Sequence, residues 1–488
     1  MLNGILLFEL LYLPVLVAVC IRIIYDTNST VKTLAYLLLT IFIPLLGIFI
    51  YFAFGTNYRK KELYSKKITS DEILWTQIKQ NIDNYSVQTY FRLPESDRPN
   101  KHIARYLSNE MSPLTAGNTA HLLINGEEKF PAVVRALEEA RDHIHIEYYI
   151  YENDKIGQTI KEILIRKTKE GVTVRFIYDD FGSHRIRKNI AKELSKEGVD
   201  AYPFYKIRFF RMAYHLNYRN HRKIIVIDGK KAFVGGINVS DKYINEPGSA
   251  NKLFWRDTHL MLEGPGAYYL QYLFICDWNF CSGKAVENIK HYFPDFPALP
   301  DSNHPDNKII QIAAGGPDST HPTIVYSLLY AIYQAQEEIL ITTPYFIPDQ
   351  SILDAIKVAA LGGVSVQLLV PEKSDSRLVE LAACSYYDDL LAAGVKLFFY
   401  RKGFIHAKTL VVDRKLAVVG TANMDFRSFD LNFEVNAIVY DDELAESLAN
   451  IFNADVKDAI LIERSAWSNR TVFRKFLEKI ARLVSPLL

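Results

Sequence analysis

A pattern of polar residues and glycines that occurs twice constrains the fold of this 488-residue chain more than any other feature. His221 and Lys223 begin the first copy, and His406 and Lys408 begin the second. A repeat of this length is typical of duplicated domains rather than of a solenoid. We therefore expect two similar lobes with a site at the seam between them. The same separation (406 − 221 = 185) also relates Asp228 to Asp413, Gly235 to Gly420, and Asn238 to Asn423.

The segments around the two motifs alternate between strand and helix patterns. "HIHIEYYIY" and "VTVRFIYDD" are typical of strands and "TIKEILIRKTKEG" of a helix, and the second half of the chain repeats this order. Strands separated by helices predict an α/β fold in which each lobe is a mixed β-sheet flanked by helices. We expect a pseudo-twofold axis to relate the lobes. The proline-rich stretch His291–Asn307 predicts the boundary between them.

Two apolar segments near the start, Gly4–Tyr25 and Thr33–Gly55, each reach the roughly 20 residues that a helix needs to span a bilayer. Both are predicted to be transmembrane helices. Basic residues follow the second segment, which predicts that the large remaining part of the chain is cytoplasmic. Glu9 lies in the first segment, where a functional role and a simple position at the membrane interface are both open. The predicted parts are a membrane anchor (1–57), a helical linker (58–113), lobe one (114–300), lobe two (301–465) and a basic amphipathic C-terminal helix (466–488).

The overall charge and the cysteines exclude several classes of protein. Fifty-seven basic and 56 acidic residues give a net charge of +1, so average charge does not indicate a polyanionic partner such as nucleic acid. Four cysteines are too few for a disulfide framework in a chain of this length. Cys276 and Cys281 have no second Cys or His pair nearby, so we interpret them as buried thiols. No metal-binding or nucleotide-binding motif is present in the sequence, and we predict chemistry without a metal or cofactor.

The His and Lys of each motif lie two residues apart at the start of a predicted strand, so their side chains leave the same face. Two imidazoles and two ammonium groups in one pocket suit a phosphodiester. The lysines can neutralise its oxygens while one histidine attacks phosphorus and the other protonates the departing alkoxide. The further groups predicted to bind the phosphate are Gly236, Asn238, Thr421 and Asn423.

Four carboxylates complete the predicted site. Asp228 and Asp413 belong to the catalytic motif, and their turn signal favours fixing of the backbone over acid/base work. Each imidazole needs a carboxylate on its other nitrogen, for which lobe two offers Glu434 and lobe one Asp257. Glu434 follows His406 by 28 residues and Asp257 follows His221 by 36 (434 − 406 and 257 − 221), which predicts an insertion in lobe one at "EPGSANK".

Two segments have the composition of membrane-contacting surfaces. Tyr205–Lys223 interleaves arginines such as Arg208 and Arg211 with aromatic residues, which favours contact with lipid headgroups over a plain basic loop or a nucleic-acid patch. Ala466–Leu488 has apolar residues at helical spacing among basic ones. That helix is predicted either to lie on the membrane or to pack on the catalytic body.

The paired H-x-K-x4-D-x6-G-x2-N motifs resemble those of the phospholipase D superfamily. Within it the chain is similar to bacterial cardiolipin synthases through "IPLLGIFIYFAFGTN", "TPYFIPD", "GTANMDFRSFDLNFEVN" and "RLVSPLL". The resemblance implies two phospholipase D-type lobes and a covalent phosphohistidine, with His221 as nucleophile and His406 as acid/base. The sequence itself does not distinguish the two histidines. One departure is Gly236, which lacks the hydroxyl of its counterpart Thr421.

The resemblance implies transfer of a phosphatidyl group between two phosphatidylglycerol molecules, giving cardiolipin and glycerol. The implied partners are phosphatidylglycerol and other anionic lipids of the cell membrane, without nucleic acid. A hydrolytic phospholipase D and a phosphatidyltransferase with another headgroup would share the same catalytic residues and are the alternatives. The sequence leaves oligomeric state, acyl preference and product release undetermined.

Overall fold

A computed structural model describes residues 2–27, 30–52, 57–92, 98–206, 218–245, 253–296, 298–299 and 307–485. The chain divides into two compact units. The first contains residues 1–71 and 207–218, and the second contains residues 72–206 and 219–488. The predicted lipid-contacting residues Arg208 and Arg211 and the predicted insertion "EPGSANK" lie outside the described residues.

The first unit contains three apolar helices, α1 (Leu2–Asp26), α2 (Thr30–Phe42) and α3 (Pro44–Ile50). The continuous helix predicted over Thr33–Gly55 is wrong, because α2 ends before Pro44, whose ring and missing N–H favour a new helix start. A Cβ on Gly47 would lie 2.4 Å from backbone atoms of Thr40, so α3 folds back closely against α2. Among the described residues, no helix combines the length and apolarity needed to cross a bilayer, and the two predicted spans are not confirmed.

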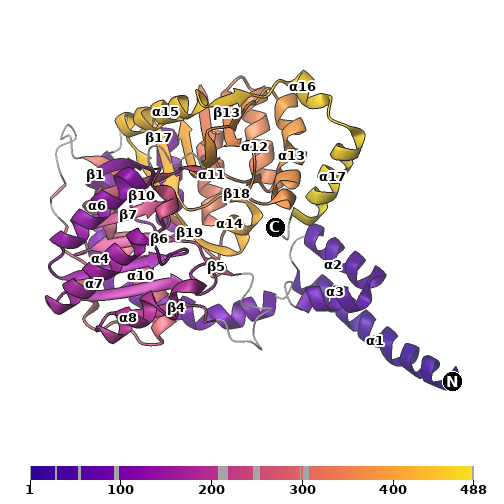
Figure 1. The fold of residues 1–488 in the computed structure, drawn as a ribbon, viewed down its shortest axis with the longest axis horizontal. Helices are drawn as coiled ribbons and strands as arrows, with labels where there is room; N and C mark the ends of the chain where they lie inside the picture. The colour runs from indigo at the N-terminus through magenta and orange to yellow at the C-terminus, as the bar shows by residue number, and fades with distance from the viewer. Residues whose placement is uncertain are drawn as a thin grey trace. The chain divides into compact units, whose positions relative to one another are not determined.

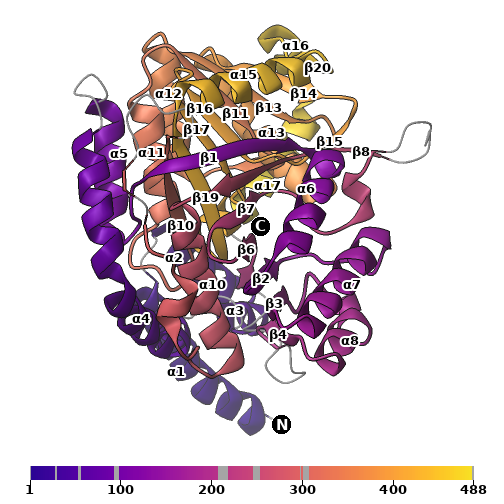
Figure 2. The same cartoon turned by 90° about the vertical axis from the view of Figure 1, so that its left-hand side faces the viewer.

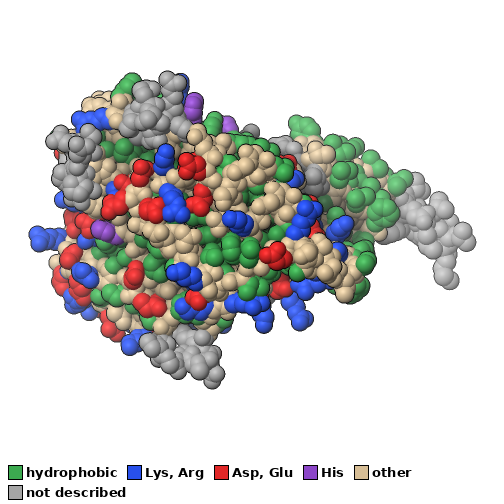
Figure 3. Space-filling model, turned by 90° about the horizontal axis from the view of Figure 1, so that it is seen from above, with side chains coloured by type: hydrophobic (Ala, Val, Ile, Leu, Met, Phe, Trp, Pro, Cys, Tyr) green, Lys and Arg blue, Asp and Glu red, His purple; other side chains and the backbone are tan. Residues whose placement is uncertain are grey.

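Hydrophobic side chains gather on the outside of these three helices (Figure 3). Among the described residues of the unit, Val19, Ile23, Tyr36 and Tyr51 form a buried hydrophobic cluster. Many others are exposed, including Leu13, Ile21, Ile24, Phe42, Leu45 and Phe49. Among the described side chains of the unit, more large apolar ones are therefore exposed than buried, which is typical of a segment that contacts lipid or another apolar partner.

Lobe one in the second unit is a mixed sheet with α6, α7 and α8 on one face and α10 on the other (Figure 1). Alternation of buried apolar strands with amphipathic helices explains this layering. Its elements are β1 (Thr115–Ile124), α6 (Asn125–Glu139), β2 (His143–Tyr148), α7 (Lys155–Lys169), β3 (Thr173–Asp179), α8 (Ile190–Lys196), β4 (Asp200–Phe204), β5 (Arg219–Asn220), β6 (Lys223–Ile227), β7 (Lys231–Gly235), β8 (Phe254–Arg256), β9 (Thr258–Glu263) and α10 (Ala267–Ser282).

Lobe two repeats the arrangement, with α11, α12 and α13 on one face of its sheet and α15 on the other. Its elements are β10 (Lys308–Gly315), α11 (Thr323–Tyr333), β11 (Glu338–Thr342), β12 (Phe346–Ile347), α12 (Gln350–Leu361), β13 (Ser365–Pro371), α13 (Arg377–Ala392), β14 (Lys396–Tyr400), β15 (Gly403–Ile405), β16 (Thr409–Val412), β17 (Leu416–Gly420), β18 (Met424–Asp425), α14 (Phe426–Asp430), β19 (Asn432–Tyr440), α15 (Asp442–Val456) and β20 (Ala459–Leu461).

One sheet runs through both lobes. From the seam outward, the strand order in lobe one is β1-β9-β7-β6-β2-β3-β4, and in lobe two it is β10-β19-β17-β16-β11-β13-β14, followed by β20. The seam is the antiparallel pair of β1 and β10, where Thr115 faces Ile310 (Figure 2). The predicted α/β fold of two similar lobes is confirmed, since equivalent strands follow in the same order on either side of the seam.

The predicted linker consists of two helices, α4 (Asn57–Arg92) and α5 (Arg98–Asn109). The later part of α4 packs on lobe one, where the Trp75 ring lies 5.1 Å from that of Tyr272 and the Tyr85 hydroxyl donates to the carbonyl of Ala116. Ile103 and Leu107 of α5 are fully buried in the core of lobe two. The part of α4 from Glu72 onward and the whole of α5 therefore belong to the catalytic body. At the other end of the chain, α16 (Arg464–Ser468) and α17 (Val472–Val484) pack on α13.

Candidate active site

The two His-x-Lys pairs lie at equivalent ends of the central hairpins, β6–β7 and β16–β17. The hairpin turn contains Asp228 in one lobe and Asp413 in the other, both with positive φ (52° and 49°). Each carboxylate accepts hydrogen bonds from three successive backbone amides that lead into the next strand of the sheet, at 2.8–3.0 Å. These contacts agree with the turn-fixing role that the sequence favoured over acid/base work, and a catalytic role stays a prediction. The strands carry both aspartates to the far end from the histidines, where they fix the backbone.

A short strand before each histidine pairs with the other lobe. β5 lies parallel to the start of β19, where Arg219 faces Asn432, and β15 lies parallel to β8. The backbone N–H of His221 donates to the carbonyl of Phe433 at 3.0 Å, and that of His406 donates to the carbonyl of Arg256 at 2.7 Å. Each histidine is therefore attached by main-chain hydrogen bonds to the lobe that does not contain it.

This crossing exchanges the predicted carboxylate partners. Nδ1 of His221 lies 2.9 Å from Glu434, and Nδ1 of His406 lies 2.8 Å from Asp257. The prediction that each carboxylate orients the histidine of its own lobe is wrong, because the residue just before each carboxylate pairs with the strand that precedes the other lobe's histidine. Since Nδ1 is used, Nε2 is the ring nitrogen left to react. Among the described residues, no hydrogen bond is formed by Nε2 of either ring.

The two lysines are buried beside the histidines. Nζ of Lys223 donates to the carbonyl of His221 at 2.6 Å, and Nζ of Lys408 donates to that of His406. Burial lowers the pKa of Lys223 to about 7, and the charge of Lys408 adds to that shift. Burial lowers the pKa of Lys408 to about 8. Two ammonium groups this poorly hydrated favour an anion that completes their hydrogen bonds.

The surroundings of both imidazoles favour their neutral form. Burial lowers the pKa of His221 to about 4, although Glu434 opposes the shift. Burial also holds the pKa of His406 well below its usual value, and Lys408, Lys223 and His221 lower it further. Lys223 and His221 belong to lobe one and His406 to lobe two. Because the first two affect the pKa of the third, groups from both lobes form one electrostatic site. A bound phosphodiester would add negative charge there and favour the protonated form of one imidazole.

The two carboxylates differ in their surroundings. Glu434 accepts hydrogen bonds from the hydroxyl of Thr421 at 2.5 Å and from Nδ2 of Asn432 at 3.2 Å. Burial disfavours its charge, but His221, Lys223 and these donors together lower its pKa. Asp257 accepts from the backbone N–H of Thr258 at 2.7 Å, and burial raises its pKa to about 6. No hydroxyl can replace the missing donor, since a Cβ on Gly236 would lie 2.1 Å from Oδ1 of Asp257.

Three of the four predicted phosphate-binding residues support the framework instead. Both side-chain atoms of the buried Asn238 are engaged, with the N–H of Ile150 and the hydroxyl of Tyr243. Thr421 holds Glu434, and Gly236 makes room for Asp257. These residues thus contact the carboxylates and the loop in the structure, and their phosphate contacts stay a prediction.

The fourth predicted phosphate-binding residue is only partly engaged. Nδ2 of Asn423 donates to Asp425 at 3.1 Å, while its buried Oδ1 has no hydrogen-bond partner in the part of the chain that the structure describes. An oxygen can only accept a hydrogen bond, so this atom does not supply a donor to phosphate.

Sequence reasoning missed the aromatic groups that surround the histidines. The Tyr149 ring stands edge-on to His221 at 4.8 Å. Trp255 and Phe404 lie 5.6 and 5.9 Å from His406. Asn432 was also missed, although it lies two residues before Glu434 on the same strand and therefore on the same face. Aromatic side chains in strands ordinarily pack in the core. Only the structure shows that these rings surround the two histidines.

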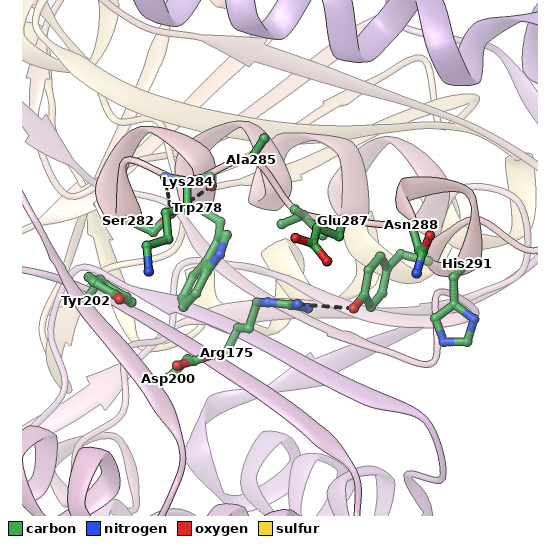
Figure 4. Close-up of a pocket in the computed structure, with 12 residues that line it drawn as sticks. Arg175, Asp200, Tyr202, Trp278, Ser282, Lys284, Ala285, Glu287, Asn288 and His291 are labelled. Carbon is green, nitrogen blue, oxygen red and sulfur yellow. Dashed lines mark hydrogen bonds between the residues drawn. The ribbon is translucent and has the colours of Figure 1, made fainter.

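A cavity of about 690 Å³ lies in lobe one, among β3, β4 and the end of α10 (Figure 4). Its lining includes Arg175, Tyr202, Trp278 and Tyr292. None of the predicted site residues lines it, so it is separate from the histidine pair. Among the described residues, no group of three His, Cys, Asp or Glu side chains could hold a metal ion.

Comparison with known proteins gives a family match in both lobes. Residues 133–255 and 328–456 match the family model "Cardiolipin synthase, PLD-like domain", and residues 15–55 match "Phospholipase_D-nuclease N-terminal". Cardiolipin synthase 2 of Bacillus cereus is 41% identical over 96% of this chain and 88% of its own length. The major cardiolipin synthase ClsA of Bacillus subtilis is 38% identical over 100% of this chain and 99% of its own length.

A solved structure gives an independent match of the fold. The phosphatidylserine synthase of Haemophilus influenzae superposes with a TM-score of 0.60 over 80% of this chain and 99% of its own. At 16% sequence identity this likeness concerns the fold alone.

Proposed function

The chain belongs to the cardiolipin synthase family of phospholipase D-like proteins, and we propose that it joins two phosphatidylglycerol molecules through a phosphohistidine intermediate. As a member of that family the chain is a phosphatidyltransferase. The observation that carries the proposed mechanism is the crossed pairing of His221 with Glu434 and of His406 with Asp257. Because each half of the site takes its carboxylate from the other lobe, neither lobe is complete alone.

In the first step, Nε2 of His221 attacks the phosphorus of one phosphatidylglycerol. A P–N bond forms and the P–O bond to the glycerol headgroup breaks. His406, protonated at Nε2, gives its proton to the departing oxygen, and glycerol leaves. Lys223 and Lys408 balance the charge of the phosphate oxygens. Glu434 favours this assignment, since its lowered pKa keeps a full negative charge beside the imidazole that becomes cationic when it is phosphorylated.

In the second step, His406 acts as the base. Its neutral Nε2 takes the proton from a headgroup hydroxyl of the second phosphatidylglycerol, whose oxygen attacks phosphorus while the P–N bond breaks. One phosphodiester has replaced another, so no activated donor is required. Since the aromatic rings of Tyr149, Trp255 and Phe404 surround the two imidazoles, water has limited access while the intermediate waits.

The N-terminal unit is proposed to hold the enzyme at the cell membrane. Support comes from its exposed apolar side chains and from the family match over residues 15–55. Basic residues that follow the apolar helices favour a cytoplasmic position for the catalytic body.

Product analysis tests the proposed reaction. Purified enzyme in vesicles of phosphatidylglycerol is expected to yield cardiolipin and glycerol in equal amounts. Phosphatidic acid as the main product would favour a hydrolytic phospholipase D, and incorporation of added serine or ethanolamine would favour another headgroup. Acid-quenched enzyme is expected to carry lipid phosphate on the peptide that contains His221, and label on the His406 peptide alone would reverse the two roles.

A further inference from the structure

We propose that helix α17 docks on an anionic lipid bilayer through an outward apolar face, independently of the catalytic scheme. The α17 apolar face consists of Val472, Phe473, Phe476, Ile480 and Leu483. Their exposed fractions are 85, 70, 58, 43 and 77%, so five large apolar side chains of one short helix stand in solvent. An amphipathic helix of a globular protein ordinarily turns that face to the core. An exposed contiguous apolar patch marks an interaction site.

The side of α17 that packs on the catalytic body holds a small apolar residue and a buried acid. Glu478 is 1% exposed and Ala481 is 2% exposed. Glu478 accepts hydrogen bonds from Arg470 at 3.0 Å and from Arg474 at 3.3 Å. The acid on the inner face is therefore neutralised by arginines of its own segment.

Further contacts hold the helix to α13. The guanidinium of Arg470 lies 3.0 Å from Asp388, and that of Arg482 lies over the ring of Tyr386 at 4.2 Å. Arg482 also lies 3.3 Å from Asp389. Rotation of α17 to bury its apolar face would break these contacts and expose a paired, buried carboxylate. These charged contacts therefore fix the outward orientation of the apolar face. Helix α17 is not a loosely attached tail.

Charge identifies the partner as an anionic lipid surface. Lys475 and Lys479 lie within the same turns as the apolar face, and Glu478, the only acidic residue of the helix, is turned inward. Apolar residues with flanking lysines and arginines are the pattern of a helix that lies in the headgroup region of an anionic membrane. A twofold contact with a second copy would instead bring these basic side chains against their own equivalents.

Site-directed spin labelling of the full chain in phosphatidylglycerol-containing proteoliposomes tests the proposal without use of the reaction. The partly exposed Cys20 and Cys281 are first changed to serine, while the buried Cys276 and Cys384 stay. A nitroxide at Phe476→Cys is expected to be accessible to oxygen and shielded from a water-soluble nickel reagent. A matched label at Leu361→Cys, an exposed apolar position of α12, is expected to be accessible to nickel.

Equal nickel accessibility at both positions would overturn the proposal. Spin–spin broadening at position 476 would also overturn it, because it would identify a second copy as the partner. In vesicles of phosphatidylcholine alone, the shielding at position 476 is expected to fall, and unchanged shielding would remove the role of the lysines.

Substituted enzymes add a functional test. Phe473→Glu with Phe476→Glu is expected to lower cardiolipin synthesis in vesicles at least tenfold, with little change on short-chain phosphatidylglycerol dissolved as monomers. Val358→Glu with Leu361→Glu, two exposed apolar residues of α12, is the matched control and is expected to change neither activity. Equal loss on both substrates would indicate a folding defect and would overturn the membrane role, as would full activity of the α17 variant in vesicles.

Discussion

Lobe one and lobe two bring the same His-x-Lys pair to the same end of a hairpin, but the carboxylates that they send across the seam are held differently. Glu434 of lobe two accepts a hydroxyl hydrogen bond from Thr421 in addition to His221. Asp257 of lobe one has a glycine, Gly236, in the place of that hydroxyl. The pKa of Glu434 is lowered and that of Asp257 is raised to about 6. The two lobes share one fold, but the groups next to Glu434 and Asp257 give these two carboxylates different pKa values.

A second difference lies beside the histidines. Arg222 follows His221 and forms a buried ion pair with Asp277 at 2.5 Å. The same guanidinium lies 5.4 Å from the ring of Phe433, which comes just before Glu434. The equivalent of Arg222 in lobe two is Ala407, which forms no such contact. A charged group thus fixes the His221–Glu434 half, whereas aromatic rings surround His406. The surroundings of Glu434 thus keep this carboxylate charged, whereas those of Asp257 allow its protonation to change with pH.

Removal of either imidazole is expected to have the largest effect. His221→Ala and His406→Ala should each lower the rate of cardiolipin synthesis by at least roughly 10⁴-fold, because each imidazole makes or breaks a covalent bond. The initial rate on phosphatidylglycerol vesicles checks this. Substantial residual activity in both variants would break the two-histidine scheme.

Neutral replacement of the carboxylates sharpens the comparison across the seam. Glu434→Gln and Asp257→Asn should each cost on the order of 10³-fold in rate, since the imidazole loses the charge that orients it. Nitrogen NMR of the imidazoles gives a direct check. Asp257→Asn is expected to shift the Nδ1 resonance of His406 and to leave that of His221 nearly unchanged. The opposite pattern would mean that the carboxylates serve their own lobes.

The donor beside Glu434 is expected to matter less. Thr421→Val removes one hydrogen bond to a buried carboxylate and should lower the rate about tenfold, by the roughly 1–3 kcal/mol that such a loss costs. Gly236→Ser tests whether lobe one only lacks a hydroxyl. Its Cβ would meet Asp257, so we expect activity to fall rather than rise. Increased activity in Gly236→Ser would show that lobe one differs from lobe two only by the missing hydroxyl.

The pH profile should report the unequal acids. Below about pH 6 Asp257 gains a proton and His406 loses its anionic partner, so kcat/KM should fall about tenfold for each pH unit. Above pH 7 to 8, Lys223 and Lys408 lose their protons and phosphate binding weakens, so kcat/KM should fall again. Glu434 stays ionised throughout this range. The residual kcat/KM of Asp257→Asn is expected not to fall below about pH 6. An unchanged fall in this variant would mean that another group causes it.

The smallest effect on chemistry is expected at the hairpin turns. Asp228→Asn or Asp413→Asn weakens hydrogen bonds to three backbone amides and should lower the free energy of unfolding by about 1–3 kcal/mol. The kcat of the folded fraction should stay within about twofold, because neither carboxylate reaches the histidines. Denaturant unfolding and active-site titration separate the two quantities. A large loss of kcat in well-folded enzyme would return these aspartates to the catalytic set.

Local pattern was sufficient for the α/β lobes and for the twofold repeat. A strand that is buried on both faces is a nearly continuous apolar run, and the runs that follow His221 and His406 display this directly. The break in the second apolar segment also had a visible signal, Pro44 followed by Gly47, but hydropathy over a long window averages across a single proline. The packing of α5 in lobe two was not visible, since an amphipathic helix does not specify which apolar surface it covers.

The sequence by itself determined which side chains are proposed to do the chemistry, because the residue types in the paired motif suit a phosphodiester wherever they meet. Only the tertiary structure decided which carboxylate serves which histidine. The pairing depends on β5 and β15 crossing to the other lobe, and such main-chain hydrogen bonds join any residues that come side by side. Nothing in the spacing of 28 and 36 residues encodes that choice. The orientation of α17 was decided in the same way, because the buried Glu478 is paired with Arg470 and the segment forms ion pairs with α13 on that side of the helix.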